Sequence, residues 1–188
     1  MQPVRRATAE LNASGGVGGA VAQIARQRGA RVIGADRVAP PDGGAIRDHA
    51  DLLLIDEPDL PAAVWKATDG RGAAVIYDCV GGKTMFEIAT RCLAHKGRLI
   101  EISATGDPIV QFNLADFYHN ETRLFGVDSL KHDLVQCART LDALRPDFES
   151  GRYRPAPIAA TYGLDDAKAA YSCVTNGAQG RIVLTPQL

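Results

Sequence analysis

Cysteine and histidine are scarce in this sequence, and neither is spaced as a metal site requires. The four cysteines and four histidines are scattered over 188 residues, and no two cysteines form a C-x-x-C pair. Zinc sites draw their ligands from clustered Cys and His residues, so no zinc is expected. Three of the cysteines fall in apolar or helical surroundings, which predicts buried, reduced thiols. The cysteines are Cys79, Cys92, Cys137 and Cys173.

An excess of charge of one sign and long apolar runs are also missing. The 21 Lys and Arg residues nearly balance the 22 Asp and Glu residues, so neither nucleic acid nor a membrane is expected as a partner. No segment has the roughly 20 apolar residues of a membrane span. No apolar run follows the basic residues near the start, so we expect no signal peptide and a cytoplasmic protein.

A glycine-rich stretch, residues 12–20, lies between a strand-like segment and a helical pattern that leads into a second strand. A dinucleotide site needs small residues there, for the tight turn, for backbone approach to a pyrophosphate and for close helix–strand contact. Ala13, Gly15 and Gly18 occupy the three spaced positions. A flexible turn without a ligand is the alternative, but the strand, turn, helix, strand order favours a nucleotide site.

Asp36 ends the second strand-like run, 21 residues after Gly15. A carboxylate at about this spacing accepts hydrogen bonds from the adenosine ribose hydroxyls, although Asp36 could instead be a solvated strand end. The carboxylate would repel a 2′-phosphate, which favours NAD over NADP. Arg37 could offset this by pairing with a phosphate, so NADP stays open.

Apolar strand-like runs alternate with helical patterns, which predicts an α/β fold with a Rossmann-type, doubly wound parallel sheet. Strands are expected at residues 8–13, 30–36, 51–56, 73–78, 98–102 and 123–127, with helices near 17–28, 45–49, 59–69 and 84–93. The first strand reads as a poor central strand, because Glu10 and Asn12 interrupt its apolar run.

Ligands of such sheets bind beyond the carboxyl ends of the strands. Four loops, at 13–18, 36–37, 78–82 and 103–107, are expected to share that edge.

The last third of the sequence is expected to begin with a helix over 134–144 that Pro146 ends. A strand near 158–161, a helix over 165–174 and a strand over 181–184 would follow. We therefore divide the chain into a dinucleotide-binding domain at 8–150 and a C-terminal tail at 151–188.

Five segments in this order resemble the medium-chain dehydrogenase/reductase superfamily, and its quinone oxidoreductase (zeta-crystallin-like) branch most. They are residues 13–18 with 23–25, then 29–34, 78–82, 97–99 and 180–186. The resemblance covers the chain from about residue 8. Members of the family carry an N-terminal GroES-like substrate domain before this region, and the sequence resembles only the second part of such a protein.

The resemblance implies a set of cofactor-binding residues but no catalytic residue. The pyrophosphate turn would comprise Ala13, Gly15, Gly16, Val17 and Gly18, with Asp36 holding the adenosine ribose. Val80 and Gly81 would border the nicotinamide, Ser103 and Ala104 would flank it, and Arg181 would lie near the cofactor phosphates.

The activity that the resemblance implies is hydride transfer from the reduced nicotinamide of NADH, or NADPH, to a quinone or enone, or between the nicotinamide and an alcohol/carbonyl substrate, without zinc. Two alternatives stay open: a non-catalytic nucleotide-binding or interaction module, and a subunit whose GroES-like half is a separate chain. The tail at 151–188 would pack on a GroES-like domain. The edge strand from Leu124 to Val127 would pair in a homodimer, unless the tail covers it.

Overall fold

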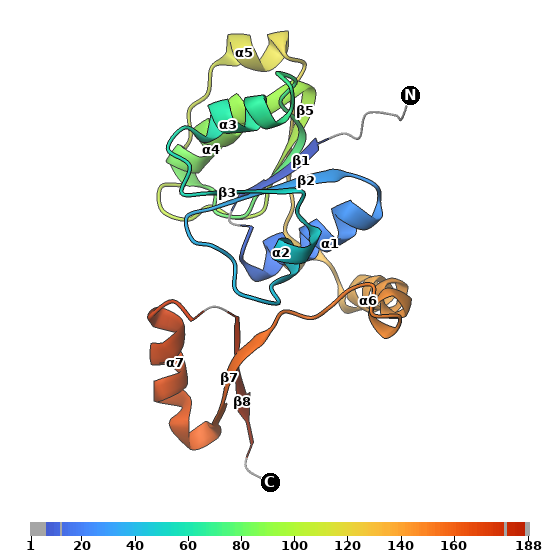
Figure 1. Ribbon diagram of the computed structural model, residues 1–188, viewed down its shortest axis with the longest axis vertical. Coiled ribbons are helices and arrows are strands. Elements are labelled where there is room, and N and C mark those ends of the chain that lie inside the picture. The colour runs from blue at the N-terminus through green and yellow to red at the C-terminus, as the bar shows by residue number, and fades with distance from the viewer. Residues whose placement is uncertain (1–6, 12, 179, 187–188) are drawn as a thin grey trace.

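The computed structural model, which describes residues 7–11, 13–178 and 180–186, contains a six-stranded parallel sheet (Figure 1). The order of its strands is β3-β2-β1-β4-β5-β6, as in a doubly wound fold. The strands are β1 (Ala7–Leu11), β2 (Arg31–Asp36), β3 (Leu52–Ile55), β4 (Ala73–Asp78), β5 (Leu93–Glu101) and β6 (Arg123–Gly126). The predicted α/β Rossmann-type class is confirmed.

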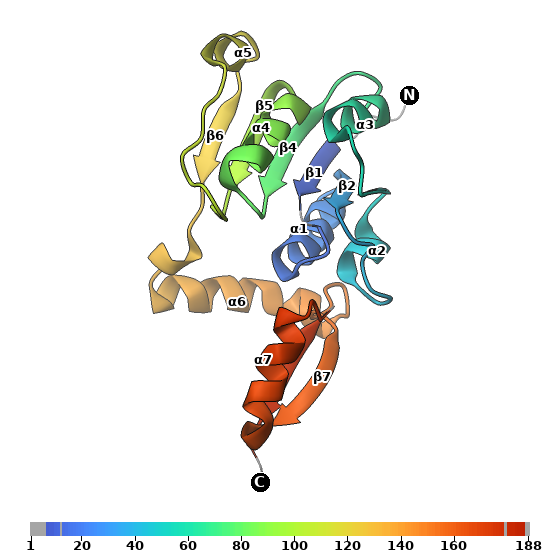
Figure 2. The same cartoon turned by 90° about the vertical axis from the view of Figure 1, so that its left-hand side faces the viewer.

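Helices cover both faces of this sheet. One face carries α1 (Gly16–Gln27) and α2 (Ala45–His49), and the other carries α3 (Leu60–Ala67) and α4 (Gly82–Cys92) (Figure 2). The short α5 (Leu114–His119) leads into β6. Asp59 caps α3 as its position before a Pro-containing first turn predicts, because its carboxylate accepts the Ala62 N–H at 3.1 Å.

The core follows from the alternation of side chains along the strands. Val32 and Ile33 on β2 are both fully buried, and as neighbours they point to opposite faces. Val32 joins Ile46 of α2 on one face, whereas Ile33 joins Val64 of α3 on the other. Gly34 lets Ile46 approach, since a Cβ at Gly34 would lie 3.0 Å from that side chain.

The first strand is central despite its interrupted pattern. β1 pairs with β2 on one side and β4 on the other, and Thr8, Ala9 and Leu11 are buried. The strand ends at Leu11, two residues before its predicted end, and the N–H of Ala13 bonds to the Ala35 carbonyl at 3.2 Å. The predicted interruption at residue 12 lies outside the described residues.

Two predicted boundaries differ from the structure by more than two residues. β5 begins at Leu93, not residue 98, because a bulge after Leu93 shifts its register against β4. The helix that was expected to end at Pro146 is α6 (Leu134–Glu149), which continues through it. Proline removes only its own N–H bond, and α6 has no buried residue, so water can satisfy the freed carbonyl.

The C-terminal tail is a separate small layer. β7 (Ile158–Gly163) and β8 (Arg181–Thr185) form a two-stranded parallel sheet, against which α7 (Ala167–Thr175) packs. In Figure 2 the strands β1, β4 and β6 point toward α6 and this tail. Two short 3-10 turns, Ser129–Lys131 and Leu164–Asp166, precede α6 and α7.

Two further expectations concern the burial of the cysteine thiols and membrane-spanning helices. The four cysteines, all among the described residues, form no disulfide, and Cys92 is buried. Cys137 is exposed on α6, so its predicted burial is wrong, while Cys79 and Cys173 are partly exposed. Within the described ranges, no helix combines the length and apolar character that a membrane crossing needs.

Candidate functional site

The glycine-rich turn opens onto the carboxyl edge of the sheet, where α1 begins. Gly15 is the N-cap, without a side chain to occupy the helix end, and Gly18 and Gly19 are buried. The first N–H groups of a helix and its dipole attract anions such as a pyrophosphate. Val17 is half exposed, and it lines neither of the two hollows described below.

Asp36 is fixed to this turn by hydrogen bonds from the backbone. One carboxylate oxygen, Oδ2, accepts the Ser14 N–H at 2.8 Å, and the other, Oδ1, accepts the Arg37 N–H at 2.7 Å. The end of β2 is thereby held against the turn that follows β1. The sequence predicted Asp36 but not the role of Ser14, whose position inside the glycine-rich stretch was the available signal.

Arg181 reaches the same turn from the tail. A Cβ added to Gly16 would lie 2.7 Å from a guanidinium nitrogen of Arg181, so the arginine occupies the space over the start of α1. The backbone of Arg181 is itself held, because its N–H bonds to the Pro157 carbonyl at 2.7 Å. A planar guanidinium at this place can bind phosphate oxygens in pairs.

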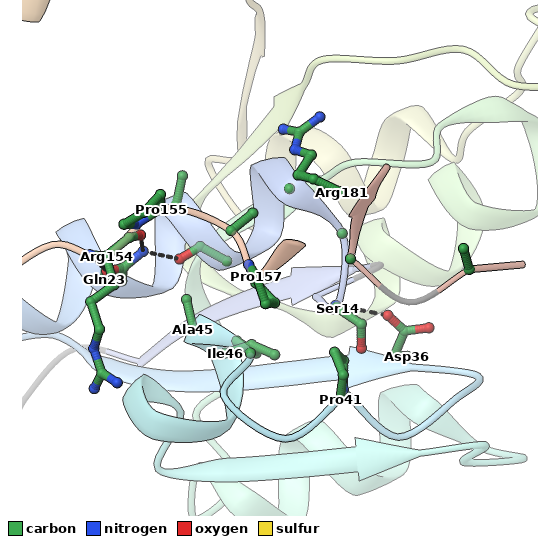
Figure 3. A pocket seen from close by; sticks show the side chains of 18 of the residues that line it. Ser14, Gln23, Asp36, Pro41, Ala45, Ile46, Arg154, Pro155, Pro157 and Arg181 are labelled. Atoms are coloured by element: carbon green, nitrogen blue, oxygen red, sulfur yellow. Dashed lines mark hydrogen bonds between the residues drawn. The ribbon is translucent and has the colours of Figure 1, made fainter. Parts of the chain in front are cut away.

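A hollow of about 690 Å³ separates the turn from the tail (Figure 3). Ser14, Asp36 and Ile46 border it on one side, and Arg154 and Arg181 on the other. A second hollow, of about 570 Å³, lies at the ends of β1 to β4 and includes Arg37 and Val80. Asp36 borders both hollows, so an elongated ligand could pass it from one to the other.

The turn between β4 and α4 and the loop after β5 meet backbone to backbone. Gly81 has a φ of 69°, and a Cβ there would lie 2.0 Å from the Ser103 carbonyl oxygen. The Thr105 N–H donates to the Val80 carbonyl at 3.0 Å. Ser103 and Ala104 line neither hollow, and their backbone lies against Gly81, next to Val80, which lines the second hollow.

The carboxyl groups of Asp78 and Glu101 lie at the ends of the two strands that lead into these loops. Asp78 is fully buried, and its Oδ1 accepts the N–H groups of Val80 and Gly81, both at 2.9 Å. Glu101, at the end of β5, is its partner in the sheet. Burial, together with the charge of Asp78, raises the pKa of Glu101 to about 7.

The described residues fit a dinucleotide and do not fit zinc. The Arg181 guanidinium lies over the start of α1, where a Cβ at Gly16 would displace it, so a positive charge and the helix N–H groups face the same space, which suits a pyrophosphate. In the described part of the chain, no three His, Cys, Asp or Glu side chains converge as a metal site requires.

Six of the twelve predicted cofactor-binding residues line the two hollows. Gly15, Gly16, Asp36 and Arg181 border the first hollow. Sequence reasoning missed residues 154–157 of the tail, because no spacing along the chain relates them to the glycine-rich turn.

Comparison with known proteins agrees with this architecture. A family described as zinc-binding dehydrogenase matches residues 16–143. A quinone oxidoreductase of Salmonella typhimurium is 27% identical over 184 residues, which cover 93% of this chain and 55% of that protein. A highly-reducing polyketide synthase of Aureobasidium melanogenum is 28% identical over 187 residues, covering 93% of this chain and 8% of that protein.

The crystal structure of AibC has a TM-score of 0.81 and 26% identity, and the match covers 98% of this chain and 51% of AibC. The chain thus spans about half the length of AibC and of the quinone oxidoreductase. Since the family match takes in α1 to most of α6, the chain belongs to the zinc-binding dehydrogenase family, as a quinone oxidoreductase-like member of the medium-chain dehydrogenase/reductase superfamily.

Proposed function

We propose that the chain binds NAD(H) along the carboxyl edge of its sheet and is the cofactor-binding part of an oxidoreductase. The observation that carries this proposal is the carboxylate of Asp36, which backbone N–H groups fix between two hollows. A carboxylate held there is ready to accept hydrogen bonds from two ribose hydroxyls.

The pyrophosphate would lie at the start of α1, between the helix N–H groups and the Arg181 guanidinium. Both attract negative charge, and the guanidinium adds paired hydrogen bonds. Asp36 would repel the additional phosphate of NADP, which favours NAD. Arg37 borders the second hollow and is the group that would accommodate NADP if it binds.

The bound nicotinamide supplies a hydride, and the chain supplies the wall beside it. Val80 and Gly81 would border the ring, and Ser103 with Ala104 would support that wall through the backbone contact at Gly81. The name of the Salmonella relative, a quinone oxidoreductase, supports a quinone as substrate, and we keep an enone, or an alcohol or carbonyl compound, as the alternatives. No side chain of this wall is assigned a catalytic role, and binding without turnover would indicate a non-catalytic nucleotide-binding module.

Two exposed apolar surfaces support partners in this proposal. Leu124, Phe125 and Val127, on and after the edge strand β6, are 45%, 43% and 49% exposed, and we propose that they pair in a homodimer. Tyr171 and Val174 on α7 are also exposed, which suits packing of the tail on a GroES-like domain of the same or a partner chain.

The test is a titration of the folded chain with NADH and NADPH, followed by calorimetry and cofactor fluorescence. We expect NADH to bind, and the Asp36→Ala variant to bind it about tenfold more weakly because its ribose contacts are lost. The control is Asp42→Ala, which removes the same charge from a side chain that is 99% exposed in the loop after β2. Failure of the folded chain to bind either cofactor would refute the proposal.

A further inference from the structure

Asp78 and Glu101 form a carboxyl pair at the carboxyl ends of two adjacent strands. They are direct partners in the pairing of β4 with β5, and partners in a parallel pair point to the same face of the sheet. Asp78 Oδ2 and Glu101 Oε1 are both buried and have no hydrogen-bond donor in the described part of the chain. A buried acceptor without a donor is unfavourable, so this arrangement needs an explanation.

A single proton on the pair removes the difficulty. A protonated carboxyl gains an O–H donor, and two carboxyl groups that share a site hold one proton between them. Glu101 is the member with the greater tendency to hold it, because burial and the neighbouring Asp78 raise its pKa to about 7.

The charges around Glu101 leave this conclusion intact. Opposite Glu101 on β6 stands Gly126, while Arg98 and Arg123 pair at the far end of the same strands. The helix α4 packs against both β4 and β5 and carries Lys83, Glu87 and Arg91. Of all these groups, Asp78 alone shifts the pKa of Glu101 by its charge.

The carboxyl pair is directly linked to the β4–α4 turn and to the loop after β5. Asp78 holds the N–H groups of Val80 and Gly81 with its other oxygen. Glu101 precedes Ser103 by two residues, and the Ser103 carbonyl lies against Gly81. Repulsion between two charged carboxylates would therefore push apart the β4–α4 turn and the loop after β5.

We propose that Glu101 is a positioning residue, which shares a proton with Asp78 and thereby keeps residues 79–82 and 103–105 closed on each other beside the nicotinamide. The location beside the nicotinamide rests on the proposed function, whereas the shared proton and the closed loops do not. The wall is closed while the proton is present and loosens as the pH rises and the proton leaves. Cofactor binding would therefore depend on the protonation of Glu101.

The direct test is a titration of the Glu101 carboxyl carbon by ¹³C NMR, assigned by its loss in Glu101→Gln. We expect a midpoint near 7, which is the value that burial and Asp78 produce. A midpoint near the ordinary glutamate value would overturn the shared proton.

The second measurement is hydrogen exchange at the amides of Gly81 and Thr105, which donate to Asp78 and Val80. Their protection factors should fall about tenfold between about pH 6 and about pH 8.5 in the unmodified chain, and should stay constant in Glu101→Gln, which keeps a permanent donor. Glu149→Gln on exposed α6 is the control and should behave like the unmodified chain. An equal fall in Glu101→Gln, or no fall in the unmodified chain, would overturn the positioning role.

NADH binding adds the functional readout. Its dissociation constant should rise about tenfold over the same pH interval in the unmodified chain and stay nearly level in Glu101→Gln, a difference of roughly 1.4 kcal/mol. Absence of binding at every pH would refute the proposed function, while the NMR and exchange measurements would still decide the role of Glu101.

Discussion

Residues 7–100 bury their apolar side chains within the chain, whereas residues 101–186 leave theirs largely exposed. The buried residues of both core clusters extend no further than Leu99, and all except Ala13 lie in the first five strands and in helices α1 to α4. Beyond Glu101, the described residues that are buried are Tyr153 and Ala170. Leu99 is 1% exposed and Leu134 on α6 is 88% exposed, although both are leucines within regular structure.

The two regions differ in how completely neighbouring strands and helices cover them, rather than in their composition. β1, β2 and β4 each have a strand on both sides and helices on both faces, so each apolar side chain meets another. β6 has one neighbouring strand, and α6 has no buried residue. Contiguous exposed apolar surface marks interaction sites, so the second region is where a partner would bind.

The contrast should be largest in thiol chemistry, because the thiolate is the reactive form. Cys92 on α4 is fully buried, and burial raises the pKa of its thiol to about 12. Cys137 on α6 is exposed. With a thiol-specific reagent at about pH 8, we expect Cys137 to be labelled on the order of a thousand times faster than Cys92, as measured by peptide mass spectrometry.

Labelling in concentrated guanidinium is the control, since both thiols are then exposed and the two rates should converge. Rates within a factor of about ten in the native chain would mean that the first region opens as readily as the second, which would end the comparison.

Matched leucine truncations should show the next largest effect. Leu99→Ala should lower the free energy of unfolding by about 3 kcal/mol, since it removes buried contacts and leaves a cavity. Leu134→Ala should change it by less than about 0.5 kcal/mol, because that side chain has few contacts to lose. Urea unfolding at low protein concentration measures both.

The same pair also detects a partner. If a second copy covers α6, then Leu134→Ala becomes destabilising as the protein concentration rises, whereas the loss in Leu99→Ala stays constant. Equal losses for both variants at every concentration would show that α6 is covered in a way that this structure does not have.

Local patterns predicted the strands of the large sheet, because its apolar runs are separated by turn residues and helical patterns. They failed where contacts between distant parts of the chain determine a boundary or the burial of a residue. The bulge after Leu93 depends on the register of β5 against β4, and α6 tolerates Pro146 because it lies outside the core. Cys137 looks buried by its helical neighbours but lies on a helix with no covering layer.

In the candidate site, too, local spacing predicted some residues, whereas contacts between distant segments could not be predicted. Asp36 follows from its distance to the glycine-rich turn, which is a property of one strand, helix, strand unit. The contacts of Ser14 with Asp36, and of Glu101 with Asp78, depend on how different strands align. The approach of Arg181 to Gly16 depends on the placement of the tail, which the sequence motif alone did not describe.

The smallest effect is expected at the junction between the two regions. Gln23 on α1 is 6% exposed, and its Oε1 accepts the Arg154 N–H at 2.7 Å while its Nε2 donates to the Arg154 carbonyl at 3.2 Å. Three residues later, Pro157 holds the backbone of Arg181. Gln23 therefore fixes the segment that carries the guanidinium to the glycine-rich turn.

Gln23→Met keeps the volume but removes both bonds, so the free energy of unfolding should fall by about 1 to 2 kcal/mol, with weaker NADH binding as Arg181 loses its position. Gln27→Met is the control, because exposed Gln27 has one long contact, 3.4 Å from its Nε2 to Asp147 Oδ1. A loss of stability with unchanged NADH binding would show that Gln23 anchors the tail without placing Arg181. Equal behaviour of the two variants would show that the tail is held by Arg181 and by the Arg154–Asp48 ion pair, whose nitrogen and oxygen are 3.0 Å apart.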